Sequence, residues 1–111
     1  MNDLDATLAA LADPTRRQVV DLLRDGPRRA SELADASNMT RPAMSRHLRV
    51  LRASGIVDVA TLEDDARGRM YTLRAERFVA LQAWLDQVQA FWSEQLTSFK
   101  AHAERTRGRS R

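Results

Sequence analysis

Residues 31–51 read Ser-Glu-Leu-Ala-Asp-Ala-Ser-Asn-Met-Thr-Arg-Pro-Ala-Met-Ser-Arg-His-Leu-Arg-Val-Leu, and the fold prediction starts from this segment. It predicts two short helices joined by a tight turn. Asn38 lies between them and tolerates a positive φ, so it is suited to turn the chain. Met44, Leu48 and Leu51 recur at i, i+4 and i+7, which predicts one buried face on the second helix. This pattern is typical of a helix-turn-helix.

The sequence also offers candidate N-caps for both helices. Ser31 is suited to cap the first helix. The second begins at either Thr40 or Arg41, because Pro42 disfavours helical geometry at the residue before it. In either case Pro42 falls in the first turn, where a missing N–H is tolerated.

The opposite face of the second helix is rich in cations. Residues 40–52 contain four arginines and no carboxylate. Such a helix fits the DNA major groove, where arginine binds guanine through two hydrogen bonds. An ordinary solvated face is the alternative, although such a face usually mixes charges of both signs. The residues of this helix predicted to contact DNA are Thr40, Arg41, Pro42, Ala43, Ser45, Arg46, His47 and Arg49.

After Gly55 the apolar period changes from that of a helix to that of a strand. Residues 57–62 and 70–73 alternate around a polar segment, which predicts a β-hairpin. Arg67 and Arg69 lie at its predicted tip and are suited to contact the phosphate backbone beside the groove. The acidic residues 63–65 would oppose such a contact.

Three further helices are predicted, over residues 3–12, 14–25 and 75–104. The last of these holds five of the six aromatic residues, more than a small domain can bury. We therefore expect this apolar stripe to form a homodimer interface together with the first helix. Burial within a single chain is the alternative. The predicted interface residues are Leu4, Leu8, Leu11, Phe78, Leu81, Leu85, Val88, Trp92 and Phe99.

Composition restricts the remaining possibilities. The 111 residues fit one domain, which we place at residues 1–104, followed by a disordered basic tail over 105–111. Cysteine is absent, which excludes disulfides and thiolate metal sites. No signal segment or long apolar run is present, so we expect a cytoplasmic protein. No cofactor motif or nucleophile–base pair stands out, and Ser45 and His47 face different ways on their helix, so we do not expect an enzyme.

Four motifs together resemble one family of regulators. They are Ala-Leu-Ala-Asp-Pro-Thr-Arg-Arg (10–17), Glu-Leu-Ala (32–34), Ser-Arg-His-Leu-Arg-Val-Leu (45–51) and Gly-Ile-Val (55–57). They are similar to motifs of the ArsR/SmtB family. The resemblance implies a mainly α winged helix-turn-helix of five helices plus a two-stranded wing. It also implies a homodimer, built from the first and last helices, that binds a palindromic operator in double-stranded DNA as a transcriptional repressor.

The chain departs from the metal-sensing members of that family. Their paired cysteines are replaced by Ala34 and Ala36, and His102 is the only histidine of the last helix, so we expect no metal site. Release from DNA would then follow from an unknown small organic effector or from falling protein concentration. Two alternatives stay open: a metal-responsive repressor with a weak His/carboxylate site, and a non-catalytic protein- or RNA-interaction module.

Overall fold

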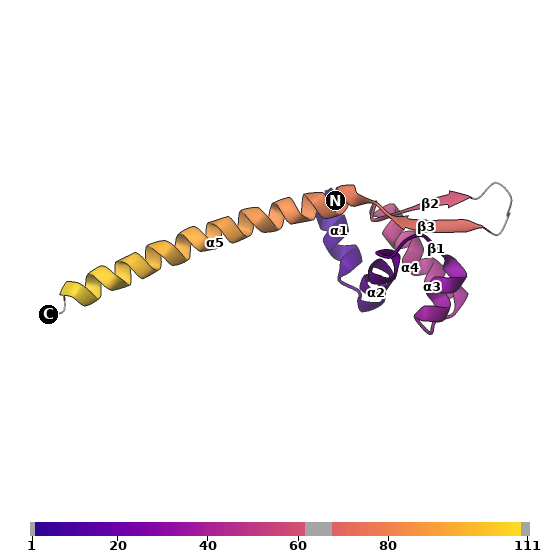
Figure 1. Cartoon of the computed structure of the whole chain (residues 1–111), viewed down its shortest axis with the longest axis horizontal. Coiled ribbons are helices and arrows are strands. Elements are labelled where there is room, and N and C mark those ends of the chain that lie inside the picture. The colour runs from indigo at the N-terminus through magenta and orange to yellow at the C-terminus, as the bar shows by residue number, and fades with distance from the viewer. Residues whose placement is uncertain (1, 62–67, 110–111) are drawn as a thin grey trace. The chain divides into compact units, whose positions relative to one another are not determined.

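A computed structural model describes residues 2–61 and 68–109 of the chain. The chain divides into two compact units, Met1–Val79 and Ala80–Arg111. The first unit contains four helices, a small sheet and the start of a fifth helix (Figure 1). The second unit is the rest of that helix.

The helices of the first unit begin where the sequence places polar caps. The Asn2 side chain accepts a hydrogen bond from the Asp5 N–H, and Asp13 does the same for Thr15. Asn38 adopts a φ of 52°, which confirms its predicted role in the turn. The prediction that Ser31 is a cap is wrong, because the helix begins at Ala30 and its N-cap is Arg29. The helices are α1 (Asp3–Leu11), α2 (Pro14–Leu23), α3 (Ala30–Ala36) and α4 (Arg41–Ala53).

The predicted hairpin is confirmed, and the sheet has a third strand that the sequence did not reveal. Strands β2 (Val57–Thr61) and β3 (Arg69–Leu73) pair antiparallel, with Val57 opposite Leu73. The two-residue strand β1 (Arg28–Arg29) pairs with the other edge of β3, so the order is β1-β3-β2. β1 leads directly into α3, and the sheet therefore anchors the start of the helix-turn-helix.

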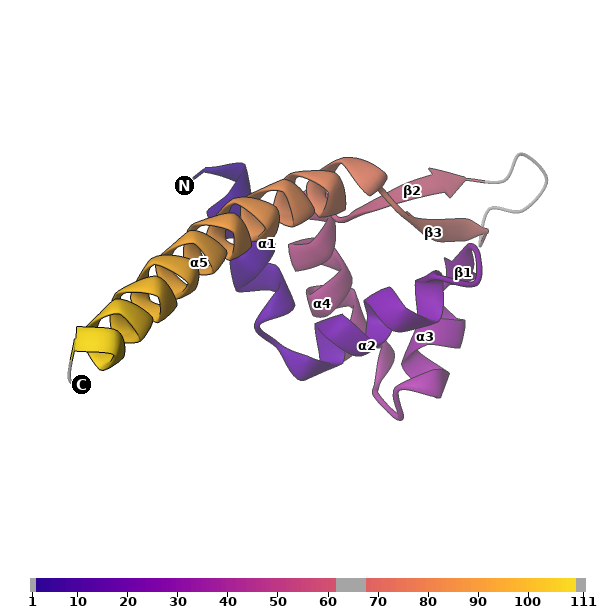
Figure 2. The same ribbon diagram turned by 60° about the vertical axis from the view of Figure 1, so that its left-hand side comes forward.

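The core of the first unit lies between α2, α3, α4 and the base of the hairpin. Figure 2 shows these helices on the same side of the paired strands β2 and β3. Met44, Leu48 and Leu51 are all buried, which confirms the predicted inner face of α4. Side chains from the other elements complete the core: Ala10, Val19, Leu23, Leu33, Ala34, Ile56 and Val57.

The fifth helix, α5 (Ala75–Arg109), is the longest element of the described chain. It continues to Arg109, whereas the sequence predicts a disordered tail from residue 105. In the part of the chain that the structure describes, no helix is long and apolar enough to cross a membrane.

Candidate nucleic-acid interface

Helix α4 is held firmly at its start and along its inner face. The Thr40 hydroxyl accepts a hydrogen bond from the Ala43 N–H at 3.3 Å, so Thr40 rather than Arg41 is the N-cap. Met44 and Leu51 are fully buried, and Leu48 is 2% exposed. Burying three such side chains contributes roughly 1.5–3 kcal/mol each to the free energy of unfolding. The opposite face of α4 is therefore presented on a rigid support.

The outer face of α4 carries most of the residues predicted to contact DNA. Arg41, Pro42, Ser45, Arg46 and Arg49 are all exposed, as is the capping residue Thr40. The first turn contains no acidic residue, so the positive end of the helix dipole is not offset there. This face combines guanidinium donors with a small hydroxyl group, which suits both phosphate oxygens and base edges.

Two of the predicted contact residues, Ala43 and His47, are half-buried instead. The Nδ1 atom of His47 lies 3.4 Å from a terminal nitrogen of Arg16 on α2. A guanidinium group has no acceptor, so this contact requires the unprotonated Nδ1 atom to accept the hydrogen bond. The structure thus gives His47 a partner within its own chain and separates it from the exposed face.

Asp13 fixes the start of α2 close to this contact. Its carboxylate accepts hydrogen bonds from the backbone N–H groups of Arg16 and Thr15, at 3.1 and 2.8 Å. These bonds, led by that from Arg16, hold the pKa of Asp13 below its usual value of 3.8. Asp13 is therefore ionised at neutral pH and stabilises the first turn that carries Arg16.

Of the two arginines predicted to contact DNA from the wing, Arg69 lies within the described residues and Arg67 does not. Arg69 is the first residue of β3 and is exposed, so it is available to a phosphate group. Arg67 and the acidic residues 63–65 lie outside the described residues.

The residues predicted to form a dimer interface fall into two groups. Leu11 and Phe78 pack against the core of the first unit and so contribute to burial within their own chain. Leu8 is 39% exposed on α1, and Leu4, Leu81 and Val88 are half-buried. The most exposed members of the set lie on α5: Leu85 at 44%, Trp92 at 58% and Phe99 at 73%.

Metal-ligating side chains do not gather in the described structure. Across residues 2–61 and 68–109, no group of three or more His, Asp or Glu side chains is placed to hold a metal ion.

Sequence reasoning missed two arginines that connect helices. Arg16 donates from Nε to the Ala10 carbonyl at 2.6 Å and also contacts His47 on α4. Arg77 donates from Nε to the Ser54 carbonyl at 3.2 Å and pairs with Asp3 on α1 at 3.4 Å. Their partners are 6 to 74 residues away in sequence, so no local sequence pattern predicts these contacts. Arg16 belongs to the motif 10–17, which is the one signal that marks it.

Comparison with known proteins places this geometry among bacterial regulators. Residues 13–59 match the model for "Bacterial regulatory protein, arsR family". The chain is 38% identical over 97 residues to the HTH-type transcriptional regulator Rv2034 of Mycobacterium tuberculosis, which covers 86% of this chain and 83% of that protein. It is 38% identical over 48 residues to the transcriptional repressor SdpR of Bacillus subtilis, covering 43% of this chain and 53% of that one.

The fold matches a solved DNA-binding domain as well. The homodimeric winged helix-turn-helix DNA-binding domain of Mb0332 from Mycobacterium bovis superimposes with a TM-score of 0.63 at 27% identity. The match covers 79% of each chain.

Proposed function

Because this chain belongs to the arsR family of bacterial regulatory proteins, we propose that it is a homodimeric repressor that binds a palindromic operator. Helix α4, over residues 41–53, is the recognition element, and the wing around residues 63–69 contacts the flanking backbone. Family membership assigns the chain to DNA-binding regulators rather than to enzymes. We place its action in the cytoplasm, where it would repress transcription by occupying a promoter, its own promoter included.

The observation that carries this proposal is the two-faced character of α4. One face is buried in the core, and the other exposes Arg41, Arg46 and Arg49 without a carboxylate among them. A helix of 13 residues is about 20 Å long, enough for its first turns to enter a major groove about 12 Å wide. Neutralising phosphates with these cations would supply the general affinity, and base contacts from the same face would supply the sequence preference.

A dimer follows from the exposed apolar side chains of α5. Leu85, Trp92 and Phe99 are each more than two-fifths exposed in the single chain. An aromatic and aliphatic stripe of this kind typically marks a protein–protein interface. The named homodimeric relative and the exposed Leu8 of α1 support the same interface. Two recognition helices related by a two-fold axis would lie about one duplex turn, roughly 34–36 Å, apart and so require a palindrome.

The experiment that tests the proposal is duplex selection followed by titration. The protein is used to select duplexes from a random library, and the winning duplex is titrated by fluorescence anisotropy against a scrambled duplex, a single strand and an RNA hairpin. We expect the selected duplex to bind at least about 1,000-fold more tightly than the scrambled one. Equal affinity for both duplexes would refute sequence-specific binding. Tighter binding of the RNA, or of neither nucleic acid, would favour an RNA- or protein-interaction module instead.

A further inference from the structure

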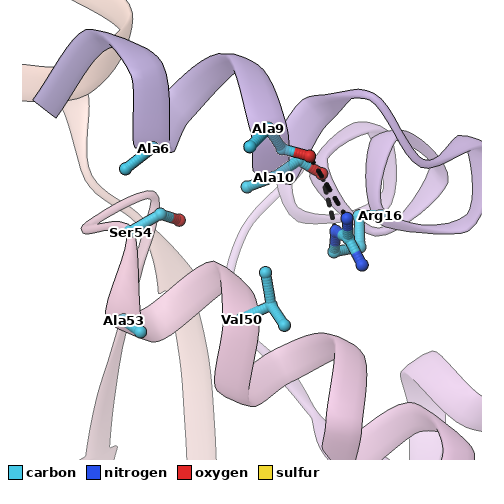
Figure 3. A pocket seen from close by; sticks show the side chains of 7 residues that line it. All are labelled: Ala6, Ala9, Ala10, Arg16, Val50, Ala53 and Ser54. Carbon is cyan, nitrogen blue, oxygen red and sulfur yellow. Dashed lines mark hydrogen bonds between the residues drawn. The ribbon is translucent and has the colours of Figure 1, made fainter. Parts of the chain in front are cut away.

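Helices α1 and α4 do not pack tightly against each other. A groove of about 310 Å³ lies between them, lined mainly by alanines of both helices and by Val50 (Figure 3). Small side chains on both walls leave little interlocking contact that could fix the angle between the helices. Direct apolar packing between α1 and α4 therefore contributes little to their relative orientation, which leaves a role for polar contacts that join the two helices.

Arg16 connects the two helices at one end of the groove. It donates to the last carbonyls of α1, from Nε to Ala10 at 2.6 Å and from a terminal nitrogen to Ala9 at 3.2 Å (Figure 3). Its other terminal nitrogen lies 3.4 Å from Nδ1 of His47, which is half-buried on α4. One planar guanidinium group thus contacts both helices, and the fixed directions of its N–H groups restrict the angle between them.

Arg77, at the start of α5, makes the matching connection at the other end. Its Nε donates to the Ser54 carbonyl, at the C-cap of α4, at 3.2 Å. Its terminal nitrogen pairs with the Asp3 carboxylate, on the first turn of α1, at 3.4 Å. A Cβ atom at Gly55 would lie 2.9 Å from the Arg77 Nε, so a glycine there leaves space for this side chain.

The two connections are separated along both helices. On α1 they lie at Asp3 and at Ala9–Ala10, and on α4 they lie at His47 and Ser54. Six or seven residues of helix correspond to roughly 10 Å. Two contact points at that separation restrain a rotation that a single contact would allow.

We propose that Arg16 and Arg77 are positioning residues that fix the recognition helix relative to α1 and so determine which operator spacing the dimer accepts. This inference rests on the proposed function, in which α1 belongs to the dimer interface and α4 reads the half-site. One base pair displaces a half-site by about 3.4 Å and turns it by roughly 35°. A rigid link between α1 and α4 therefore rejects a duplex with altered spacing, whereas a loose link tolerates it.

The test varies the spacing of the two half-sites. The probes are the duplex selected by the wild-type protein and two derivatives with one base pair inserted or deleted at its centre. For the wild type we expect each derivative to bind at least about tenfold more weakly than the parent. For Arg16→Met and for Arg77→Met we expect each derivative to bind at most about threefold more weakly than the parent duplex.

A matched control separates positioning from loss of charge. Arg17 donates to the Leu11 and Ala12 carbonyls at the same end of α1, at 2.8 and 3.1 Å, and in the described part of the chain it makes no hydrogen bond or ion pair with α4. Arg17→Met removes the same charge, and we expect it to keep the wild-type spacing ratio. His47→Asn retains an acceptor near the place of Nδ1, and His47→Leu removes it. We expect only His47→Leu to lose the spacing preference, so this pair tests the Arg16 connection even if Arg16→Met fails to fold.

A second measurement needs no DNA. The chain has no cysteine, so Ser45→Cys allows one spin label on each recognition helix of a dimer. We expect a narrow distance distribution between labels in the wild-type background and a broad one with Arg16→Met. Unchanged distributions together with an unchanged spacing ratio would overturn the inference. No dipolar signal in the wild-type background would instead contradict the proposed homodimer.

Discussion

Replacing Arg46 by alanine separates base recognition from folding. Arg46 is exposed on the outer face of α4, and within the described residues it makes no hydrogen bond or ion pair. Alanine is the best helix former, so the change should leave the free energy of unfolding almost unchanged. If Arg46 binds a guanine through two hydrogen bonds, its loss costs about 1–3 kcal/mol, which weakens operator binding by about 5- to 150-fold.

The assay is an anisotropy titration of the selected duplex and of variants with each other base at the affected position. We expect Arg46→Ala to bind these variants with nearly equal affinity, because the group that distinguishes them is gone. Arg24→Ala is the control, since Arg24 is an exposed arginine that pairs only with Asp21 across 4.0 Å in the described structure. It removes the same charge away from α4. Wild-type affinity and base preference in Arg46→Ala would refute the assignment of α4 as the recognition helix.

Four further predictions address the wing, the dimer, acid stability and metal. Arg69→Ala should weaken binding to all duplexes alike and lower the slope of log K against log salt by about 1, and an unchanged slope would contradict a phosphate contact. Leu85→Asp should shift the protein towards monomer in sedimentation, whereas Gln87→Asp, on the opposite face of α5, should not. Hydrogen bonds in the folded state lower the pKa of Asp13, so its ionised form stabilises the fold at pH values above 3.8, and this contribution is lost as the pH falls through the lower pKa of the folded state. In urea unfolding, the free energy of unfolding of Asp13→Asn should therefore decrease less in acid than that of the wild type. Stoichiometric zinc, cadmium or arsenite should leave operator affinity unchanged, and a tenfold loss of that affinity would favour a metal-responsive mechanism instead.

The helix-turn-helix could be predicted from sequence because its signals are local. A positive φ at Asn38, the Thr40 cap and the spacing of Met44, Leu48 and Leu51 each depend on residues within a turn or two. Gly55 likewise ends α4 with a φ of 79°, at the point where the sequence period changes. The candidate DNA-binding face follows from the same periodicity, because it is the side of α4 opposite the buried residues.

Other features depend on residues far apart in the chain. Strand β1 exists because Arg28 pairs with Tyr71, and two residues carry no period that reveals a strand. At the start of α3, Glu32 accepts from the Arg29 N–H at 3.1 Å, and this contact places the helix start before Ser31. The end of α5 is helical to Arg109, and the Arg, Glu and Ala residues of this segment favour a helix by their intrinsic propensity.

His47 shows why periodicity alone cannot assign every residue of a recognition helix. His47 lies at the margin between the buried stripe and the exposed face, and its hydrogen-bond partner is Arg16, which lies 31 residues earlier in the sequence. Residues at this margin can affect DNA binding without touching DNA, because they determine how the exposed face is presented. Substitutions there should therefore change the preferred arrangement of half-sites, whereas substitutions of Ser45 or Arg46 should change the preferred bases. Measuring spacing and base preference on the same set of variants distinguishes the two kinds of residue on a single helix.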